Sequence, residues 1–75
     1  MHDHPELSDL VDRLEAEPLP ALIAPVRVAA LLDMDKRRVY DLVAMGEFAG
    51  VRVGKRGLRI FRDSLFEWLR RGGSA

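Results

Sequence analysis

Residues 35–48, DKRRVYDLVAMGEF, carry the pattern that decides the fold. Apolar side chains recur there at intervals of three and four, which places them on one side of a helix. These side chains are Val39, Leu42 and Val43. Asp35 stands where a helix N-cap is favoured, and Gly46 is typical of the residue that closes a helix. The stretch therefore predicts an amphipathic helix with its charged residues facing outward.

Just upstream, a second helix is expected to begin at Pro25, because proline is favoured in the first helical turn. Its apolar face is made of Val28, Ala29, Leu31 and Leu32. The segment Asp33-Met34-Asp35 interrupts this pattern before the next helix starts. Two short helices joined by such a turn form a helix-turn-helix unit.

Downstream, the spacing changes to that of paired strands. Apolar and charged side chains alternate over residues 51–53, as in a strand. Residues 54–57 (GKRG) are typical of a turn, and residues 58–61 (LRIF) are predicted to form the second strand. A last helix is predicted from Asp63 to Arg71, with Leu65, Trp68 and Leu69 on its buried side. The sequence thus predicts a mostly α fold with a small β-hairpin, a winged helix-turn-helix in which the hairpin is the wing.

One more helix is predicted at the N-terminus, from Glu6 to Glu17, and it ends at Pro18. Its apolar stripe consists of Leu7, Leu10, Val11 and Leu14. We interpret this stripe as a face that packs within the molecule, with a self-association surface as the alternative. Leu22 and Ile23 follow as a short extended lead-in to the helix-turn-helix unit.

Three parts are expected along the chain. Residues 1–20 form the acidic helix and a proline-rich linker, residues 21–71 the winged helix-turn-helix domain, and residues 72–75 a flexible tail. Phe48, Phe61 and Trp68 are predicted to lie in the core. Phe66 lies off the apolar stripe of the last helix, so it is covered by the N-terminal helix or exposed for a contact between copies.

The charges are divided unevenly between the two ends of the chain. The 75 residues hold twelve basic and twelve acidic residues and are neutral in sum. Residues 1–24 hold six acids and one base, a balance of −5, whereas residues 25–75 hold eleven bases and six acids, a balance of +5. Within residues 36–62, eight bases stand against two acids. This asymmetry predicts a body that binds a polyanion and carries an acidic appendage.

The helix over residues 35–46 is the first candidate binding element. Lys36, Arg37 and Arg38 occupy its first turn, and an arginine fork matches the O6 and N7 atoms of guanine. Tyr40 is either part of this binding face or a half-buried edge of the core. Asp41 either accepts a hydrogen bond from cytosine N4 or orients an arginine, and we favour the second role. The partner predicted for this helix is double-stranded DNA.

The wing is the second candidate binding element. Its cations are Arg52, Lys55, Arg56 and Arg59. Because a narrow minor groove attracts inserted arginine, Arg56 is the strongest candidate for a groove contact. The other three are expected to touch phosphates, which position a protein without specifying sequence.

The chain from about residue 23 to residue 70 resembles a known family, and the acidic N-terminal helix lies outside the matching region. The matching segments are residues 28–32, 35–43, 46–48, 51–56, 59–60 and 65–69. They occur in order between residues 23 and 70 and resemble the excisionase-like branch of the MerR-type winged helix-turn-helix proteins. The resemblance departs from the family at Ala24-Pro25, which lacks a capping hydroxyl, at Asp33, where glycine is usual, and at Ala49-Gly50, where proline is common.

The resemblance implies a recombination directionality factor of a phage or mobile element. Such a factor binds attachment-site repeats as neighbouring copies, bends the DNA and directs a tyrosine-type integrase toward excision. It also implies base contacts by Lys36, Arg37 and Arg38 and phosphate contacts by Tyr40 and Arg52. Lys55 and Arg56 would make the wing contacts.

Other classes of function find little support in the sequence. No catalytic set is evident, so the chain is not expected to be an enzyme and needs neither cofactor nor small-molecule substrate. His2 and His4 lack a third ligand, so no metal site is predicted. No apolar run is long enough for a membrane span, and a cytoplasmic, nucleoid-associated protein is expected.

Two alternatives stay open at this point. The first is a small transcription regulator of a phage or host operon. The second is a protein-interaction module that acts through the acidic N-terminal helix. For that helix itself, the two hypotheses are that its charge shades the basic face or that it packs on Phe66.

Overall fold

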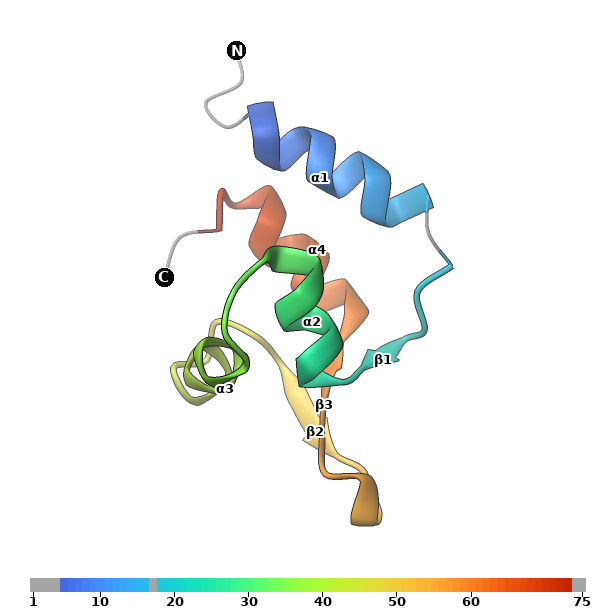
Figure 1. Ribbon diagram of the computed structural model, residues 1–75, viewed down its shortest axis with the longest axis vertical. Coiled ribbons are helices and arrows are strands. Elements are labelled where there is room, and N and C mark those ends of the chain that lie inside the picture. Colours follow the sequence, from blue (N-terminus) through green and yellow to red (C-terminus); the bar gives the residue numbers. More distant parts are fainter. Residues whose placement is uncertain (1–4, 17, 74–75) are drawn as a thin grey trace.

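The structure is a computed structural model that describes residues 5–16 and 18–73, with side chains from Leu10 onward. Within these residues the fold has four helices and a small antiparallel sheet, and the hairpin of the sheet projects away from the helices (Figure 1). In chain order the elements are α1 (Pro5–Ala16), β1 (Leu22–Ile23), α2 (Pro25–Leu32), α3 (Lys36–Ala44), β2 (Gly50–Arg52), the 3₁₀ turn η1 (Gly54–Arg56), β3 (Leu58–Phe61) and α4 (Arg62–Arg70). The predicted winged helix-turn-helix with an extra N-terminal helix is confirmed.

The turn between α2 and α3 depends on a left-handed residue. Asp33 adopts φ 56° and ψ 50°, a conformation that aspartate tolerates better than most residues. Its N–H donates to the Ala30 carbonyl, and that of Met34 donates to the Ala29 carbonyl, which together close α2. The aspartate at the usual glycine position is therefore compatible with the helix-turn-helix geometry.

Neither helix of this unit begins with a side-chain cap. Asp35 occupies the N-cap position of α3, as predicted, although its carboxylate makes no capping bond. Its carbonyl instead accepts from the N–H groups of Arg38 and Val39. Ala24 precedes α2 with no capping bond either, as its methyl side chain requires.

The sheet contains one strand more than the predicted hairpin. Its order is β1-β3-β2, and both pairs are antiparallel. The lead-in at Leu22 and Ile23 pairs with Phe61 and Ile60, so β3 is the central strand. The N-terminal part of the chain is thereby joined to the strand that leaves the wing.

The core of the described residues lies between the sheet and the helices. Its buried side chains come from every helix, from β1 and β3, and from the segments before β1 and β2; they are Val11, Leu14, Leu19, Ile23, Val28, Ala29, Val39, Leu42, Phe48, Leu58, Ile60, Leu65, Phe66, Trp68 and Leu69. Phe48 and Trp68 meet edge to face with ring centroids 5.0 Å apart, a favourable aromatic geometry. Both were predicted core residues.

Phe61 was predicted to lie in the core, and this prediction is wrong, because the residue is 42% exposed. Successive side chains of a strand point to opposite faces. Leu58 and Ile60 face the core, which leaves Arg59 and Phe61 on the outer face of β3. The alternation of side chains along β3 thus places Phe61 on the outer face, although its side chain is apolar.

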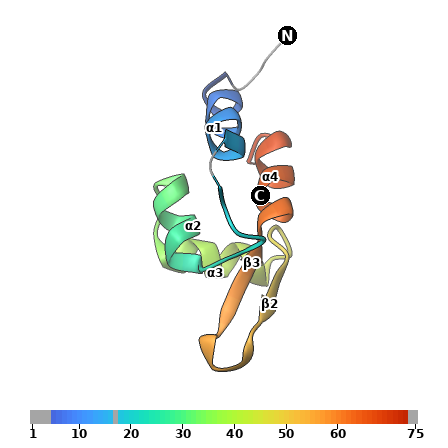
Figure 2. The same cartoon turned by 90° about the vertical axis from the view of Figure 1, so that its right-hand side faces the viewer.

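Helix α1 packs along α4 at the end of the molecule opposite the wing (Figures 1 and 2). Val11 and Leu14 of α1 are buried, and Phe66 is only 8% exposed, so α1 covers it. Arg70 pairs with Glu15, and Arg62 Nη1 donates to the Leu19 carbonyl at 2.9 Å. The interpretation of the stripe as an internal face holds for its described members; the side chain of Leu7 lies outside the described residues.

Gly72 and Gly73, which were predicted to belong to a flexible tail, follow α4 in a hydrogen-bonded turn. Their N–H groups donate to the carbonyls of Leu69 and Trp68, both at 3.0 Å. Ser74 and Ala75, like His2 and His4, lie outside the described residues. Over residues 5–16 and 18–73 no helix has both the length and the hydropathy of a membrane span.

Candidate nucleic-acid interface

Helix α3 presents its polar face to solvent and its apolar face to the core. Val39 and Leu42 are fully buried. Every residue of the predicted recognition surface on this helix is exposed: Lys36, Arg37, Arg38, Tyr40 and Asp41. Arg37 and Asp41 stand one turn apart on the side opposite the core, because residues four apart share a helix face. The solvent side of the helix thus offers three cations and a tyrosine hydroxyl.

Tyr40 and Asp41 were each given two possible roles. Tyr40 is 42% exposed, which leaves much of its ring free beside the cations. Asp41 was expected to orient an arginine, but the arginine–carboxylate pairs among the described residues are Arg62–Asp63 and Arg70–Glu15. The carboxylate of Asp41 is therefore free in this structure to meet a hydrogen-bond donor.

The wing is a tight, well-bonded projection. The N–H of Val53 donates to the Gly57 carbonyl and that of Arg56 to the Val53 carbonyl, each at 2.9 Å. These bonds close the 3₁₀ turn η1, in which Lys55 and Arg56 are exposed. Both views show the turn at the extreme lower end of the molecule (Figures 1 and 2). The wing tip therefore holds two cations clear of the rest of the fold.

The two faces of the hairpin differ in their relation to α3. A Cβ built on Gly50 would lie 3.7 Å from Val43 Cγ1 and 3.1 Å from Leu58 Cδ1, so the inner face of β2 approaches α3 and β3 closely. Arg52, two residues on, shares this face. Val51 lies opposite Arg59 on the outer face. Arg52 therefore lies on the α3 side of the hairpin, and Arg59 does not.

Gly57 sets the shape of the wing, and its replacement gives a test. It adopts φ 84° and ψ −151°, a region that is essentially restricted to glycine. A methyl group added at this position would have no atom within 4 Å beyond Gly57 and its two chain neighbours, so the cost of Gly57→Ala comes from the backbone conformation alone. We expect it to lower the free energy of unfolding by about 1–3 kcal/mol, measured by thermal melting.

Gly54→Asn is the matched control for this prediction, because φ is +50° at that position and asparagine tolerates left-handed conformations. It should change the melting temperature less than Gly57→Ala does. Equal effects of the two substitutions would contradict the special role of Gly57.

The acidic helix α1 and the basic wing lie at opposite ends of the molecule. Helix α1, which carries four acids and one base, is far from the wing in both views (Figures 1 and 2). This arrangement does not support shading of the wing by the charge of α1, whereas the hypothesis that α1 packs on Phe66 agrees with the burial of that ring.

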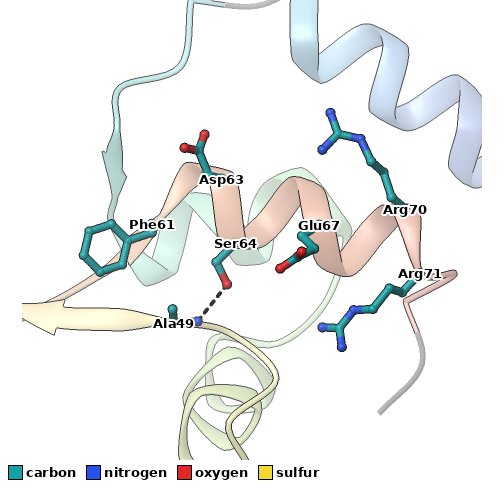
Figure 3. Close-up of a pocket in the computed structure, with 7 residues that line it drawn as sticks. All are labelled: Ala49, Phe61, Asp63, Ser64, Glu67, Arg70 and Arg71. Atoms are coloured by element: carbon teal, nitrogen blue, oxygen red, sulfur yellow. Dashed lines mark hydrogen bonds between the residues drawn. The ribbon is translucent and has the colours of Figure 1, made fainter.

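A shallow depression of about 720 Å³ lies on the outer side of α4 (Figure 3). Its lining residues are Ala49, Phe61, Asp63, Ser64, Glu67, Arg70 and Arg71. The Ser64 hydroxyl accepts a hydrogen bond from the Ala49 N–H at 2.8 Å, which ties the segment before β2 to α4. We assign Ser64 a structural role. Within the described part of the chain, no cluster of side chains has the composition of a metal site.

Two arginines have roles that the sequence pattern did not reveal. Arg62 was counted with the cations of residues 36–62, yet it holds the Leu19 carbonyl. Arg59 was assigned to the wing, and its guanidinium contacts the hairpin backbone. Only the folded arrangement could reveal the first contact, because its partners are 43 positions apart.

The fold and this exposed cationic surface define a DNA-binding protein of the winged helix-turn-helix class. A family model described as a helix-turn-helix domain matches residues 27–73, which is more than half of the chain. The chain belongs to this helix-turn-helix domain family. The match covers most of α2 and all elements that follow it, and leaves α1 and β1 outside. No curated protein and no solved structure gave a match.

Proposed function

We propose that this protein is an architectural DNA-binding factor of the excisionase type. It would bind attachment-site repeats as neighbouring copies, bend the DNA and direct a tyrosine-type integrase toward excision. The observation that carries the DNA-binding part is the exposure of five cations on α3 and the wing tip, namely Lys36, Arg37, Arg38, Lys55 and Arg56. The excision role is supported by the family resemblance of residues 23–70.

In the proposed complex, α3 lies in the major groove and the wing lies over the adjacent minor groove. An α-helix fits the major groove, whereas an arginine on a thin projection fits a narrow minor groove. Arg37 and Arg38 would read base edges, and Arg56 would enter the minor groove. Lys55 and Arg52 would contact phosphates, with Arg52 well placed because it shares the α3 side of the hairpin.

Salt dependence tests the DNA-binding proposal. If the protein contacts about five to seven phosphates, the slope of log K against log salt should be about −4.5 to −6. Affinity for a labelled duplex should then fall about 10³-fold between 50 and 200 mM salt, measured by fluorescence anisotropy. A flat response, or no binding at low salt, would contradict the proposal and favour a protein-interaction module.

Footprinting and a bending assay separate excision from transcriptional control. An architectural factor should protect several repeats side by side on the attachment region of the host element and should retard circularly permuted fragments to different extents. One isolated protected site on straight DNA would instead favour a small transcription regulator. The proposal also holds that the protein acts without catalysis, so DNA recovered from these complexes should be intact.

A further inference from the structure

The guanidinium of Arg59 is bonded to the backbone of its own hairpin. Its Nη1 donates to the Leu58 carbonyl at 2.8 Å and to the Arg56 carbonyl at 3.0 Å. A guanidinium Nη1 has two hydrogens, so both are used by these bonds. The side chain is half-buried, unlike those of Lys55 and Arg56, which are exposed.

The two carbonyls that Arg59 binds lie on either side of Gly57. That glycine has the conformation restricted to its residue type, with φ 84° and ψ −151°. The chain reverses there, and one side chain joins the carbonyl before the reversal to the carbonyl after it. The hydrogen bonds of Val53 close the turn from the other strand. Arg59 therefore closes the wing on the β3 side.

The direction of the side chain also separates Arg59 from the binding surface. It lies opposite Val51 in the strand register and on the outer face of β3, with Phe61. Arg52 lies on the other face, toward α3. A residue on the outer face that is folded back onto its own strand is poorly placed to reach a duplex held between α3 and the wing.

We propose that Arg59 is a positioning residue that fixes the wing tip and makes no contact with DNA. It acts through Arg56, whose carbonyl it binds, and so presents the two exposed cations of η1 in one orientation. This inference rests on the proposed DNA-binding function. It reassigns one cation of the wing from phosphate contact to the internal support of the turn.

The expected consequence of losing Arg59 is a wing that must be ordered when DNA binds. Ordering a loop on association weakens affinity, and we expect about a tenfold loss for Arg59→Gln. Because no phosphate contact is removed, the slope of log K against log salt should stay that of the wild type. Lys55→Gln is the matched control: it should make the slope shallower by about 0.9, the value of one contact.

Arg59→Lys provides a second test. A lysine at this position keeps the positive charge and can serve a phosphate contact, but its flexible stem and rotatable ammonium lack the pre-organised geometry of the planar guanidinium, so the two carbonyls that Arg59 Nη1 holds are held less firmly. We expect this variant to behave like Arg59→Gln, with reduced affinity and an unchanged slope. Recovery of wild-type affinity by lysine would overturn the inference, as would a slope shallower by one contact in Arg59→Gln.

A measurement without DNA completes the design. The backbone ¹⁵N order parameters of Lys55, Arg56 and Gly57 should fall from about 0.85 toward 0.6 in both Arg59 variants, while those of α3 stay unchanged. Order parameters that do not change would also overturn the inference. If the wild-type protein fails to bind DNA, the proposed function is wrong, and the order parameters still decide whether Arg59 holds the wing.

Discussion

Leu14→Ala is expected to lower the free energy of unfolding by about 2–5 kcal/mol, the usual cost of truncating a fully buried leucine. Leu14 is 2% exposed and lies in the core between α1 and α4. A domain of this size has a total stability of about 4–11 kcal/mol, so the loss is a large fraction of it. The melting temperature should drop by about 10–30 °C, measured by circular dichroism.

Asp12→Ala is the matched control on the same helix, because Asp12 is exposed. Its effect should stay within about 0.5 kcal/mol. The exposed Glu15–Arg70 pair should contribute at most about 1 kcal/mol, so Glu15→Gln tests charge separately from packing. If Leu14→Ala melted at the wild-type temperature, α1 would not be packed on α4 in solution.

Replacing all three cations of α3 by alanine should cause the largest loss of DNA affinity. The variant Lys36→Ala/Arg37→Ala/Arg38→Ala removes the proposed base contacts, of which each good bidentate pair contributes about 1–3 kcal/mol of discrimination. It should bind at least about 10²-fold more weakly and discriminate poorly among sequences, as measured by anisotropy with specific and scrambled duplexes. All three side chains are exposed, so the melting temperature should change little.

Single substitutions separate the helix from the wing. Arg37→Ala should cost about 1–3 kcal/mol and relax the preference at one base pair, because it removes a base contact. Lys55→Ala should weaken all sequences about equally and make the salt slope shallower by about one contact. Identical behaviour of the two variants would mean that the division of roles between α3 and the wing is wrong.

The helices of this protein were predictable from local sequence because each has apolar residues at helical spacing and residues that mark its ends. The spacing of Val39 and Leu42 placed α3, and Pro25 marked the first residue of α2. The hairpin was predictable for the same reason, since its strands flank a glycine-bounded turn. For the site, the exposure of the cations on α3 followed from the position of the apolar stripe. Their contacts with DNA remain predictions.

The contacts between distant segments were not predictable in this way. The pairing of Leu22 with Phe61 depends on the strand register, and the two residues are far apart in the sequence. Phe61 was misplaced because its apolar character suggested burial, whereas the alternation set by Leu58 and Ile60 turned it outward. The proposed support of the wing by Arg59 could not be predicted from the sequence. An arginine in a basic hairpin has the same sequence pattern whether it contacts phosphate or supports the turn.

The separation of α1 from the wing has a consequence for how the protein meets DNA. The molecule is 43 Å long, and Figure 1 shows α1 and the wing at the two ends of its long axis. In the field of a polyanion, such an uneven distribution of charge experiences a torque that turns the positive end forward before contact. At physiological ionic strength that field decays over about 8 Å, and α1 lies several such lengths from the wing tip along the long axis. Repulsion between α1 and DNA can thus help to orient the protein as it approaches. The same repulsion does not weaken the contacts of the wing once the protein is bound.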